Sequence, residues 1–124
     1  MVFDEVRSSL EKALSRLAEL RLLSAGWHDG AGKQLTREAL QTAEQFFVIR
    51  PALSGLYSIF PTEPGGILVD FEHKGWDWSL EFAPSGKVEM YGIEVDGDQE
   101  MEPVEFATLD ALLDEFDRRT SIDG

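Results

Sequence analysis

A glycine-rich loop near the N-terminus holds the residues that come closest to a catalytic arrangement. His28 and Asp29 are neighbours within the segment from Gly26 to Lys33. Histidine exchanges protons near neutral pH, and an adjacent carboxylate can orient its ring, so the two residues could act as a base and its orienting group. No serine or lysine stands at a spacing that would complete a nucleophilic site with them. A small enzyme or ligand-binding protein that uses His28 and Asp29 is therefore one of the functions that the sequence leaves open.

The chain lacks the motifs of nucleotide and metal sites. Counting back from Lys33 places Trp27 where a phosphate-binding loop requires glycine, and Gln34 replaces the hydroxyl residue that would hold magnesium. Asp96 and Asp98 alternate with other residues like calcium ligands, but the calcium loop with its closing glutamate is missing. The absence of cysteine excludes disulfides and thiolate metal sites. We therefore expect no metal and no cofactor.

A more regular pattern lies between Ile67 and Val95, where carboxylates alternate with apolar residues. Alternation at period two sends one set of side chains into a core and the other set to the opposite face of a sheet. The expected core set is apolar and consists of Ile67, Val69, Phe71, Trp76, Trp78, Leu80, Phe82, Val88 and Met90. The opposite set is acidic and includes Asp70, Glu72, Asp77, Glu81 and Glu89.

Gly92 interrupts this alternation. Val88 and Met90 fit one face of the strand, whereas Tyr91 and Ile93 follow the other phase. The change predicts a β-bulge or a kink at the glycine. Such a break would turn Tyr91 and Ile93 towards the acidic face.

The net charge of −13 is concentrated in the second half of the chain. Residues 1–62 carry seven basic and seven acidic side chains, so the excess of acid lies in residues 63–124. A field of that sign repels nucleic acid and anionic membranes and attracts basic proteins. We therefore expect no direct binding to DNA, RNA or membranes. A surface that only keeps the protein in solution has the same sign, and this alternative stays open.

The surrounding segments predict helices that would cover the apolar side of the acidic strands. We expect helices over residues 2–23, 36–50 and 108–119, strands over residues 56–60, 67–73, 76–82 and 88–95, an acidic loop over residues 96–103 and a short edge strand over residues 104–106. The fold class is thus α+β: an antiparallel meander of four to five strands packed against two N-terminal helices and one C-terminal helix. The chain length fits a single domain over residues 1–124.

Helix ends have recognisable signals. Thr36 and Thr108 are expected N-caps, Gly26 is an expected left-handed cap of the first helix, and Pro51 ends the second helix. The first helix carries one apolar stripe that includes Phe3, Val6, Leu10, Leu14, Leu17 and Leu20. This stripe packs on the protein's own sheet or forms the seam of a homodimer.

Trp27 has two interpretations. A tryptophan in a glycine-rich loop commonly anchors the loop on the core while its indole N–H binds a carbonyl. Tryptophan is also enriched among the residues that dominate binding at protein interfaces. We therefore keep Trp27 among the candidate partner-binding residues.

Two short motifs resemble those of a group of uncharacterised small bacterial and phage proteins. The first is Gly-Trp-x-x-Gly at residues 26–30, and the second is Pro-Thr-x-x-Gly-Gly-Ile at residues 61–67. The group commonly has a compact Gly-Trp-Asp-Gly loop, into which His28 is inserted here, and a tryptophan where this chain has Phe71. The resemblance covers residues 15–90 and implies no catalytic residue.

These patterns favour a non-enzymatic, acidic protein-binding module that inhibits or neutralises a basic partner. An immunity protein, an antitoxin or a phage-encoded inhibitor of a nucleic-acid-handling complex, such as an anti-CRISPR protein that mimics nucleic acid, would fit. The predicted partner-binding residues are Asp70, Glu72, Asp77, Glu81, Glu89, Tyr91, Glu94, Asp96, Asp98 and Trp27. The N-terminus lacks the features of a secretory signal, so we expect a cytoplasmic location.

Overall fold

The computed structural model describes residues 2–28, 30–50, 57–97 and 99–120, with side chains described from residue 10 onward. Helices α1 (Val2–Arg21) and α2 (Arg37–Ile49) precede the strands, and α3 (Leu109–Thr120) follows them. The strands are β1 (Ser58–Pro61), β2 (Ile67–His73), β3 (Trp76–Phe82), β4 (Val88–Glu94) and β5 (Glu100–Phe106). They pair antiparallel in chain order. The predicted α+β class is confirmed. None of the described helices is both long and apolar enough to cross a membrane.

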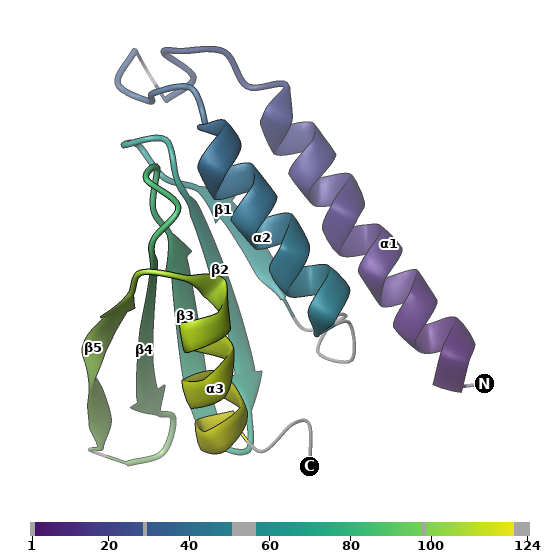
Figure 1. Ribbon diagram of the computed structural model, residues 1–124, viewed down its shortest axis with the longest axis vertical. Coiled ribbons are helices and arrows are strands. Elements are labelled where there is room, and N and C mark those ends of the chain that lie inside the picture. The colour runs from purple at the N-terminus through teal and green to yellow at the C-terminus, as the bar shows by residue number, and fades with distance from the viewer. Residues whose placement is uncertain (1, 29, 51–56, 98, 121–124) are drawn as a thin grey trace.

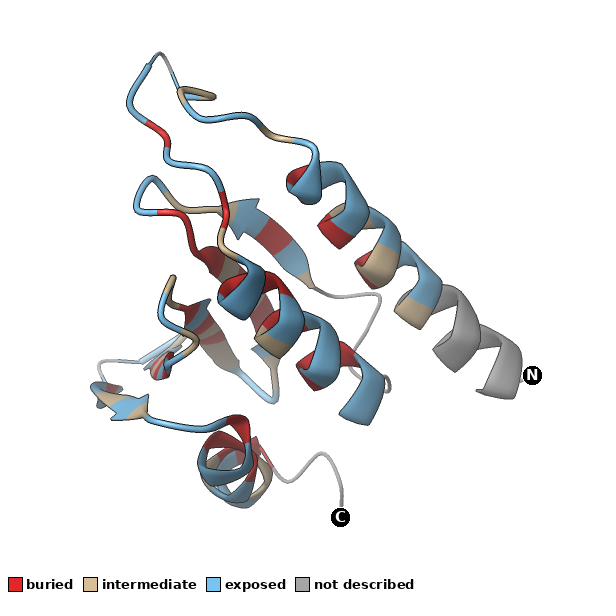
Figure 2. Cartoon of the chain, turned by 45° about the horizontal axis from the view of Figure 1, so that its top comes forward, coloured by how far each residue is buried: buried red, intermediate tan, exposed pale blue. Residues whose placement is uncertain are grey.

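The helices form one layer and the sheet forms the other (Figure 1). Helix α2 contacts β2 and β3, α3 contacts β4 and β5, and α1 packs on α2 and on β1. Buried positions on α2 and α3 point towards the sheet (Figure 2). Within the described chain no helix covers the opposite side of the sheet. The sheet therefore has one buried face and one uncovered face, as antiparallel sheets commonly do.

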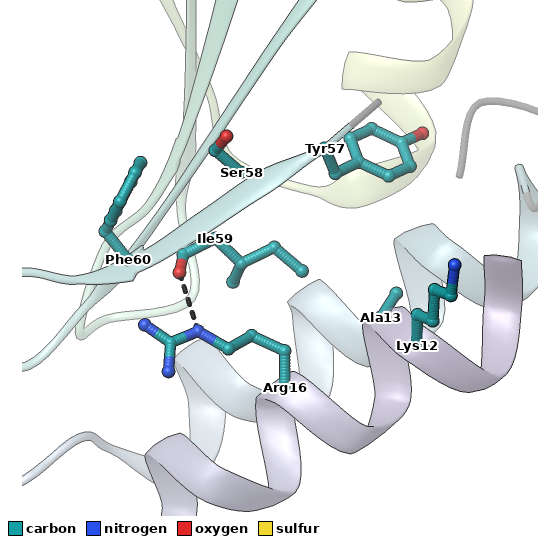
Figure 3. Close-up of a pocket in the computed structure, with 7 residues that line it drawn as sticks. All are labelled: Lys12, Ala13, Arg16, Tyr57, Ser58, Ile59 and Phe60. Atoms are coloured by element: carbon teal, nitrogen blue, oxygen red, sulfur yellow. Dashed lines mark hydrogen bonds between the residues drawn. The ribbon is translucent and has the colours of Figure 1, made fainter. Parts of the chain in front are cut away.

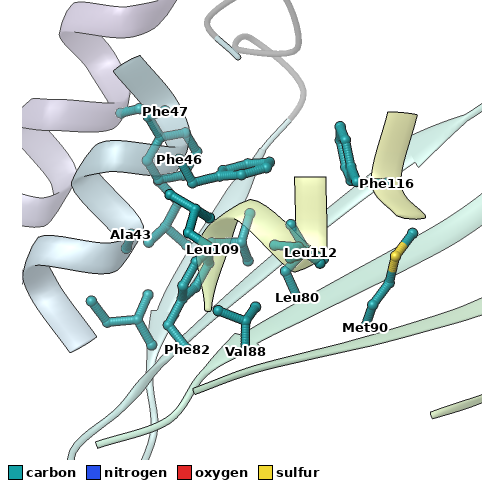
Figure 4. Close-up of a cluster of buried hydrophobic side chains, with 14 of the residues drawn as sticks. Ala43, Phe46, Phe47, Leu80, Phe82, Val88, Met90, Leu109, Leu112 and Phe116 are labelled. Atoms are coloured by element: carbon teal, nitrogen blue, oxygen red, sulfur yellow. The ribbon is translucent and has the colours of Figure 1, made fainter. Parts of the chain in front are cut away.

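The core is centred on Phe46 of α2, which is fully buried. Its ring contacts the rings of Phe47, Tyr57, Phe82 and Phe116, all at centroid distances between 5.2 and 6.2 Å. These rings come from α2, α3, β3 and the residue before β1, and those of Phe46, Phe47, Phe82 and Phe116 lie between the layers (Figure 4). Burial raises the pKa of the Tyr57 hydroxyl, with the Arg50 charge opposing it. One aromatic cluster thus joins the helical layer to the sheet.

Local signals fix the ends of the helices. The Thr36 hydroxyl accepts a hydrogen bond from the Ala39 N–H at 3.1 Å, and Thr108 does the same for Ala111 at 3.2 Å, so both predicted N-caps are confirmed. Arg50, just past the end of α2, forms a two-point ion pair with Asp117 of α3. Pro51, which we expected to end α2, lies outside the described residues.

The end of α1 differs from the prediction. Gly26 has a positive φ of 87°, but α1 already ends at Arg21. Gly26 belongs instead to a separate turn, in which its carbonyl accepts a hydrogen bond from the Gly30 N–H at 3.0 Å. The prediction that Gly26 caps α1 is therefore wrong. Of the described part of the apolar stripe, Leu17 and Leu20 are buried within the chain at 2% exposure each, whereas Leu10 and Leu14 are partly buried.

Two tight hairpins set the register of the central strands. Lys74 and Gly75 both have positive φ, at 51° and 81°, as a two-residue hairpin of type I′ requires. Gly86 also has a positive φ of 94° and closes the next hairpin, where the Ala83 N–H donates to the Lys87 carbonyl at 2.8 Å. Both hairpin turns lie between the strands that the sequence predicted. The alternation predicted for β2 and β3 is consequently kept along their whole length.

The irregularity predicted at Gly92 is confirmed in the pairing of β4 with β5, but the predicted change of phase within β4 is wrong. Strand β4 keeps one continuous register with β3, and Gly92 lies on the buried face beside Met90. Glycine is required there because an added Cβ would lie 2.5 Å from the Trp78 ring. The irregularity occurs in the pairing with β5, where the register shifts between Met90 and Gly92. Tyr91 faces the uncovered side without any change of phase in β4.

Two other expectations need correction. The segment predicted as an acidic loop with a short edge strand forms the seven-residue strand β5, in which Met101 is buried opposite Gly92. The pattern missed it because Pro103 and four carboxylates interrupt the apolar alternation around Met101. Trp76, expected in the core, is only half-buried at the end of β3, where it stacks on Trp78 with a centroid distance of 5.3 Å.

Candidate functional site

The uncovered side of the sheet is the strongest candidate site, and we call it the outer face. Its members are the residues that alternate with the buried ones along each strand. They are Ser58, Phe60, Leu68, Asp70, Glu72, Asp77, Ser79, Glu81, Glu89, Tyr91, Ile93, Glu100 and Glu105. The outer face therefore carries seven carboxylates and no basic side chain among these positions.

The register places several of these carboxylates directly opposite one another. Glu81 of β3 pairs with Glu89 of β4, and Glu89 pairs in turn with Glu105 of β5. Glu72 of β2 pairs with Asp77 of β3. Side chains at such positions have Cβ atoms about 5 Å apart, and like charges there destabilise a sheet. The outer face thus retains three repulsive pairs that the fold alone does not require.

A fourth acidic contact joins Asp70 and Asp77, which are diagonal neighbours on β2 and β3. Partial burial, a hydrogen bond with Asp77 and the charge of Asp77 together raise the pKa of Asp70 to about 6, against a smaller lowering by the Phe71 N–H. The Asp70 Oδ1 atom is itself buried and has no hydrogen-bond partner. Asp70 therefore holds a proton in weakly acidic solution.

Few cations neutralise the outer face. Within the described part of the chain, only one ion pair reaches it, between Lys87 Nζ and Glu105 at 3.6 Å. The described arginine ion pairs all lie on the helical side and involve Arg16, Arg21, Arg50, Arg118 and Arg119. The Tyr91 hydroxyl donates to Glu100 at 2.9 Å, and this hydrogen bond raises the pKa of Tyr91. The described arginines thus pair with carboxylates of the helical side and leave the outer face acidic.

The structure brings six of the predicted binding residues together on the outer face. These six are Asp70, Glu72, Asp77, Glu81, Glu89 and Tyr91. Glu94 instead pairs with Trp76 on the helix-facing side, and Asp96 lies in the turn between β4 and β5. Asp98 lies outside the described residues. Glu94 and Asp96 are therefore not part of the site.

Sequence reasoning did not name six members of the outer face, which are Ser58, Phe60, Leu68, Ser79, Glu100 and Glu105. Glu100 and Glu105 were assigned to a loop and a short edge strand, so the prediction did not place them beside β4. Phe60 and Leu68 are directly opposite each other on β1 and β2. Leu68 alternates with the buried Ile67 and Val69, and that alternation was the available signal for its position.

Trp27 lies in the loop between α1 and α2, not on the outer face. Its indole Nε1 donates to the Lys33 carbonyl at 2.7 Å, and its ring fills the space beside Gly32, where an added Cβ would lie 2.4 Å away. The ring also stacks on His28 at a centroid distance of 5.7 Å. These contacts are those expected of an aromatic anchor that closes its own loop.

The loop histidine has a carboxylate partner that the sequence did not predict. His28 Nδ1 lies 2.8 Å from Glu63, and both side chains are more than half exposed, at 56% and 53%. Asp29 lies outside the described residues. No set of three or more histidine, aspartate or glutamate side chains able to hold a metal ion occurs among the residues that are described. The described side-chain contacts of His28 are therefore its exposed pair with Glu63 and its stacking on Trp27.

We compared the chain with protein-family models, with curated proteins and with solved structures, and none of them matches it. The function must therefore be argued from the geometry of the outer face.

Proposed function

We propose that the protein is a non-enzymatic binding module whose outer face binds a basic region of another protein. The partner would be a toxin, a nuclease or a nucleic-acid-binding complex, and binding would block its positively charged site. An immunity protein, an antitoxin or a phage-encoded inhibitor acts in this way. The proposal is supported chiefly by the three carboxylate pairs that oppose each other across the uncovered strands.

A basic partner would relieve the electrostatic repulsion between the opposed carboxylates of the outer face. Opposed carboxylates destabilise the free protein, because the chain supplies one lysine on this face and directs its described arginine pairs to the helical side. A basic partner would place a cation between Glu81 and Glu89 and convert the repulsion into attraction. The binding free energy then gains from relief of repulsion as well as from new ion pairs.

This mechanism determines the kinetics of binding. A concentrated acidic field steers a basic partner towards the face and accelerates association, and added salt screens the field. We therefore expect fast association whose rate falls steeply with ionic strength. Nucleic acid has the same charge as the outer face and would be repelled.

The test is affinity capture from a lysate of the source cells, followed by affinity measurement with the captured protein. The bait is compared with the double variant Glu81→Lys, Glu89→Lys. The matched control is Glu11→Lys, Asp114→Lys, which makes the same change in net charge at exposed positions of α1 and α3.

We expect the outer-face variant to lose about a hundredfold in affinity, the size expected when two charge contacts become repulsive, and the control to lose less than about threefold. Equal losses in the two variants would mean that only net charge matters. No loss in either variant would show that the outer face is not the binding site.

A further inference from the structure

Phe60 and Leu68 form an apolar corner on the otherwise acidic outer face. Phe60 is 46% exposed, and Leu68, directly opposite it, is half-buried. The same cross-strand row continues through Glu81, Glu89 and Glu105. Figure 3 shows Phe60 projecting from the side of β1 opposite to Ile59, away from α1. One row thus places two apolar side chains at one end and three carboxylates at the other.

The exposed ring of Phe60 is not explained by a further strand that pairs with the free edge of β1. Arg16 of α1 donates from Nε to the Ile59 carbonyl at 3.0 Å and so occupies a backbone group of that edge (Figure 3). Helix α1 runs beside the strand, with a groove of about 340 Å³ between them that is lined in part by Lys12 and Arg16. Pro61 has no N–H to offer a further strand. A partner that adds a strand to β1 is therefore disfavoured, whereas Phe60 is accessible from the face.

The form of the partner follows from the polar groups of its backbone. An extended segment laid flat on the outer face would bury N–H and C=O groups that have no partners there. A helix satisfies these groups internally and can present apolar and basic side chains on one side. Neighbouring strands are about 4.8 Å apart, so Leu68 and Glu89 are separated by about 10 Å across two strand intervals. Helical residues seven positions apart are separated by about the same distance and lie on one side of the helix.

We infer that the outer face binds a basic amphipathic helix of the partner, with apolar side chains on Phe60 and Leu68 and lysine or arginine side chains on Glu81 and Glu89. This inference rests on the proposed function and adds the chemical form of the partner's contacting segment. A partner that offered only cations would leave the Phe60 ring in water. Interfaces commonly combine an apolar centre with charged groups around it.

The test uses a synthetic helical peptide of about 18 residues, long enough to form helix in water. Two leucines stand four positions apart on one face, and lysines follow seven and eleven positions after the first leucine. A second peptide has the same composition in an order that distributes the leucines around the helix. Binding of both to the full chain is followed by fluorescence anisotropy at low salt.

We expect the amphipathic peptide to bind about tenfold more tightly than the rearranged one, as burial of one or two apolar side chains predicts. Phe60→Ser and Leu68→Thr should each remove most of this preference. Val48→Ser is the matched control, since Val48 is 53% exposed on α2, and it should leave the preference unchanged. Circular dichroism establishes that each variant is folded.

The outcomes separate this inference from the proposed function. If Phe60→Ser keeps the preference while Glu81→Lys, Glu89→Lys weakens both peptides, the amphipathic helix is wrong and the acidic binding face stands. If the charge reversal weakens neither peptide, the proposed function fails as well. Sedimentation of the chain alone provides a third outcome: a dimer that Phe60→Ser dissociates would show that a second copy occupies the corner.

Discussion

The buried and outer faces of the sheet are made from alternate residues of the same strands, yet they differ in how closely the fold constrains them. On the buried face, Phe82, Leu80 and Met90 are fully enclosed and fill a shared core. On the outer face, their neighbours Glu81 and Glu89 oppose each other without a cation between them. Packing explains these three residues of the buried face. The carboxylates of the outer face oppose one another and reduce stability, so packing does not account for them.

The largest expected difference between the faces comes from adjacent residues of β3. Phe82→Ala should lower the free energy of unfolding by about 3–5 kcal/mol, because it removes a fully buried ring that contacts Phe46. Glu81→Gln, one residue away, should change it by less than about 0.5 kcal/mol. Urea denaturation of both variants measures the contrast. Similar losses for the two would mean that the outer face is also structural.

A smaller effect tests how tightly the buried face is packed around its glycine. Gly92→Ala would place a Cβ 2.5 Å from the Trp78 ring, so we expect a loss of about 1–3 kcal/mol from overpacking. Ile93→Ala, at the next position on the outer face, should have an effect within about 0.5 kcal/mol. Thermal denaturation compares the two variants. An unchanged melting temperature for Gly92→Ala would contradict the close contact between β4 and Trp78.

The pH dependence of stability tests the Asp70–Asp77 pair. Asp70 has a pKa of about 6 in the folded protein, whereas an aspartate in an unfolded chain has a pKa of about 4. The folded state thus binds more protons between these values, so the contribution of Asp70 is present below pH 4 and is lost as the pH rises through 6. We expect Asp70→Asn to be more stable than the parent at pH 7, by about 1 kcal/mol because solvent screening reduces the effect, and to lose that advantage at pH 4.

The neighbouring residue provides the control for this pH series. Asp77→Asn removes the adjacent charge, so the stability of that variant should change less between pH 4 and pH 7 than that of the parent. Urea denaturation at several pH values gives the comparison. Parallel curves for the parent and Asp70→Asn would contradict a raised pKa at Asp70.

The smallest predicted effects come from removing one negative charge at either of two positions. Glu89→Gln should stabilise the protein by about 0.2–1 kcal/mol at low salt, because Glu89 faces Glu81 and Glu105. Asp110→Asn should instead destabilise it by about 0.3–1 kcal/mol, because Asp110 lies in the first turn of α3, where a carboxylate is favourable. Both effects should shrink as salt is added. Changes of the same sign would mean that net charge, and not position, sets the stability.

Much of the difference between the buried and outer faces could be predicted from the sequence, because alternate residues of a strand point to opposite faces of the sheet. Alternation in β2 and β3 was sufficient to assign Asp70, Glu81 and their buried neighbours. The pattern was least informative where tertiary contacts decide the conformation. Strand β5 forms because Met101 fits beside Gly92, and Gly92 is needed because the Trp78 ring fills its space. These are contacts between strands, and no local sequence pattern records them.

The sequence predicted that the candidate site is acidic, but it did not predict which carboxylates lie opposite one another. Composition placed the acid in the second half of the chain, yet only the register shows that Glu81 faces Glu89 and that Glu89 faces Glu105. Glu94 is also a glutamate of β4, but it lies on the helix-facing side. An odd number of residues separates the two faces along a strand, and Glu94 is five residues from Glu89. Residue type therefore predicts the chemistry of the surface, and strand pairing decides which residues share it.

The most direct test of the proposed function is a methyl-resolved NMR titration of the protein with its captured basic partner. Leu68 and Ile93 report on the outer face, whereas Leu22 and Val48 are exposed reporters on the helical side. We predict that the methyl signals of Leu68 and Ile93 shift or broaden on binding and that those of Leu22 and Val48 do not. Shifts confined to Leu22 and Val48 would contradict the proposal, because the partner would then bind the helical layer.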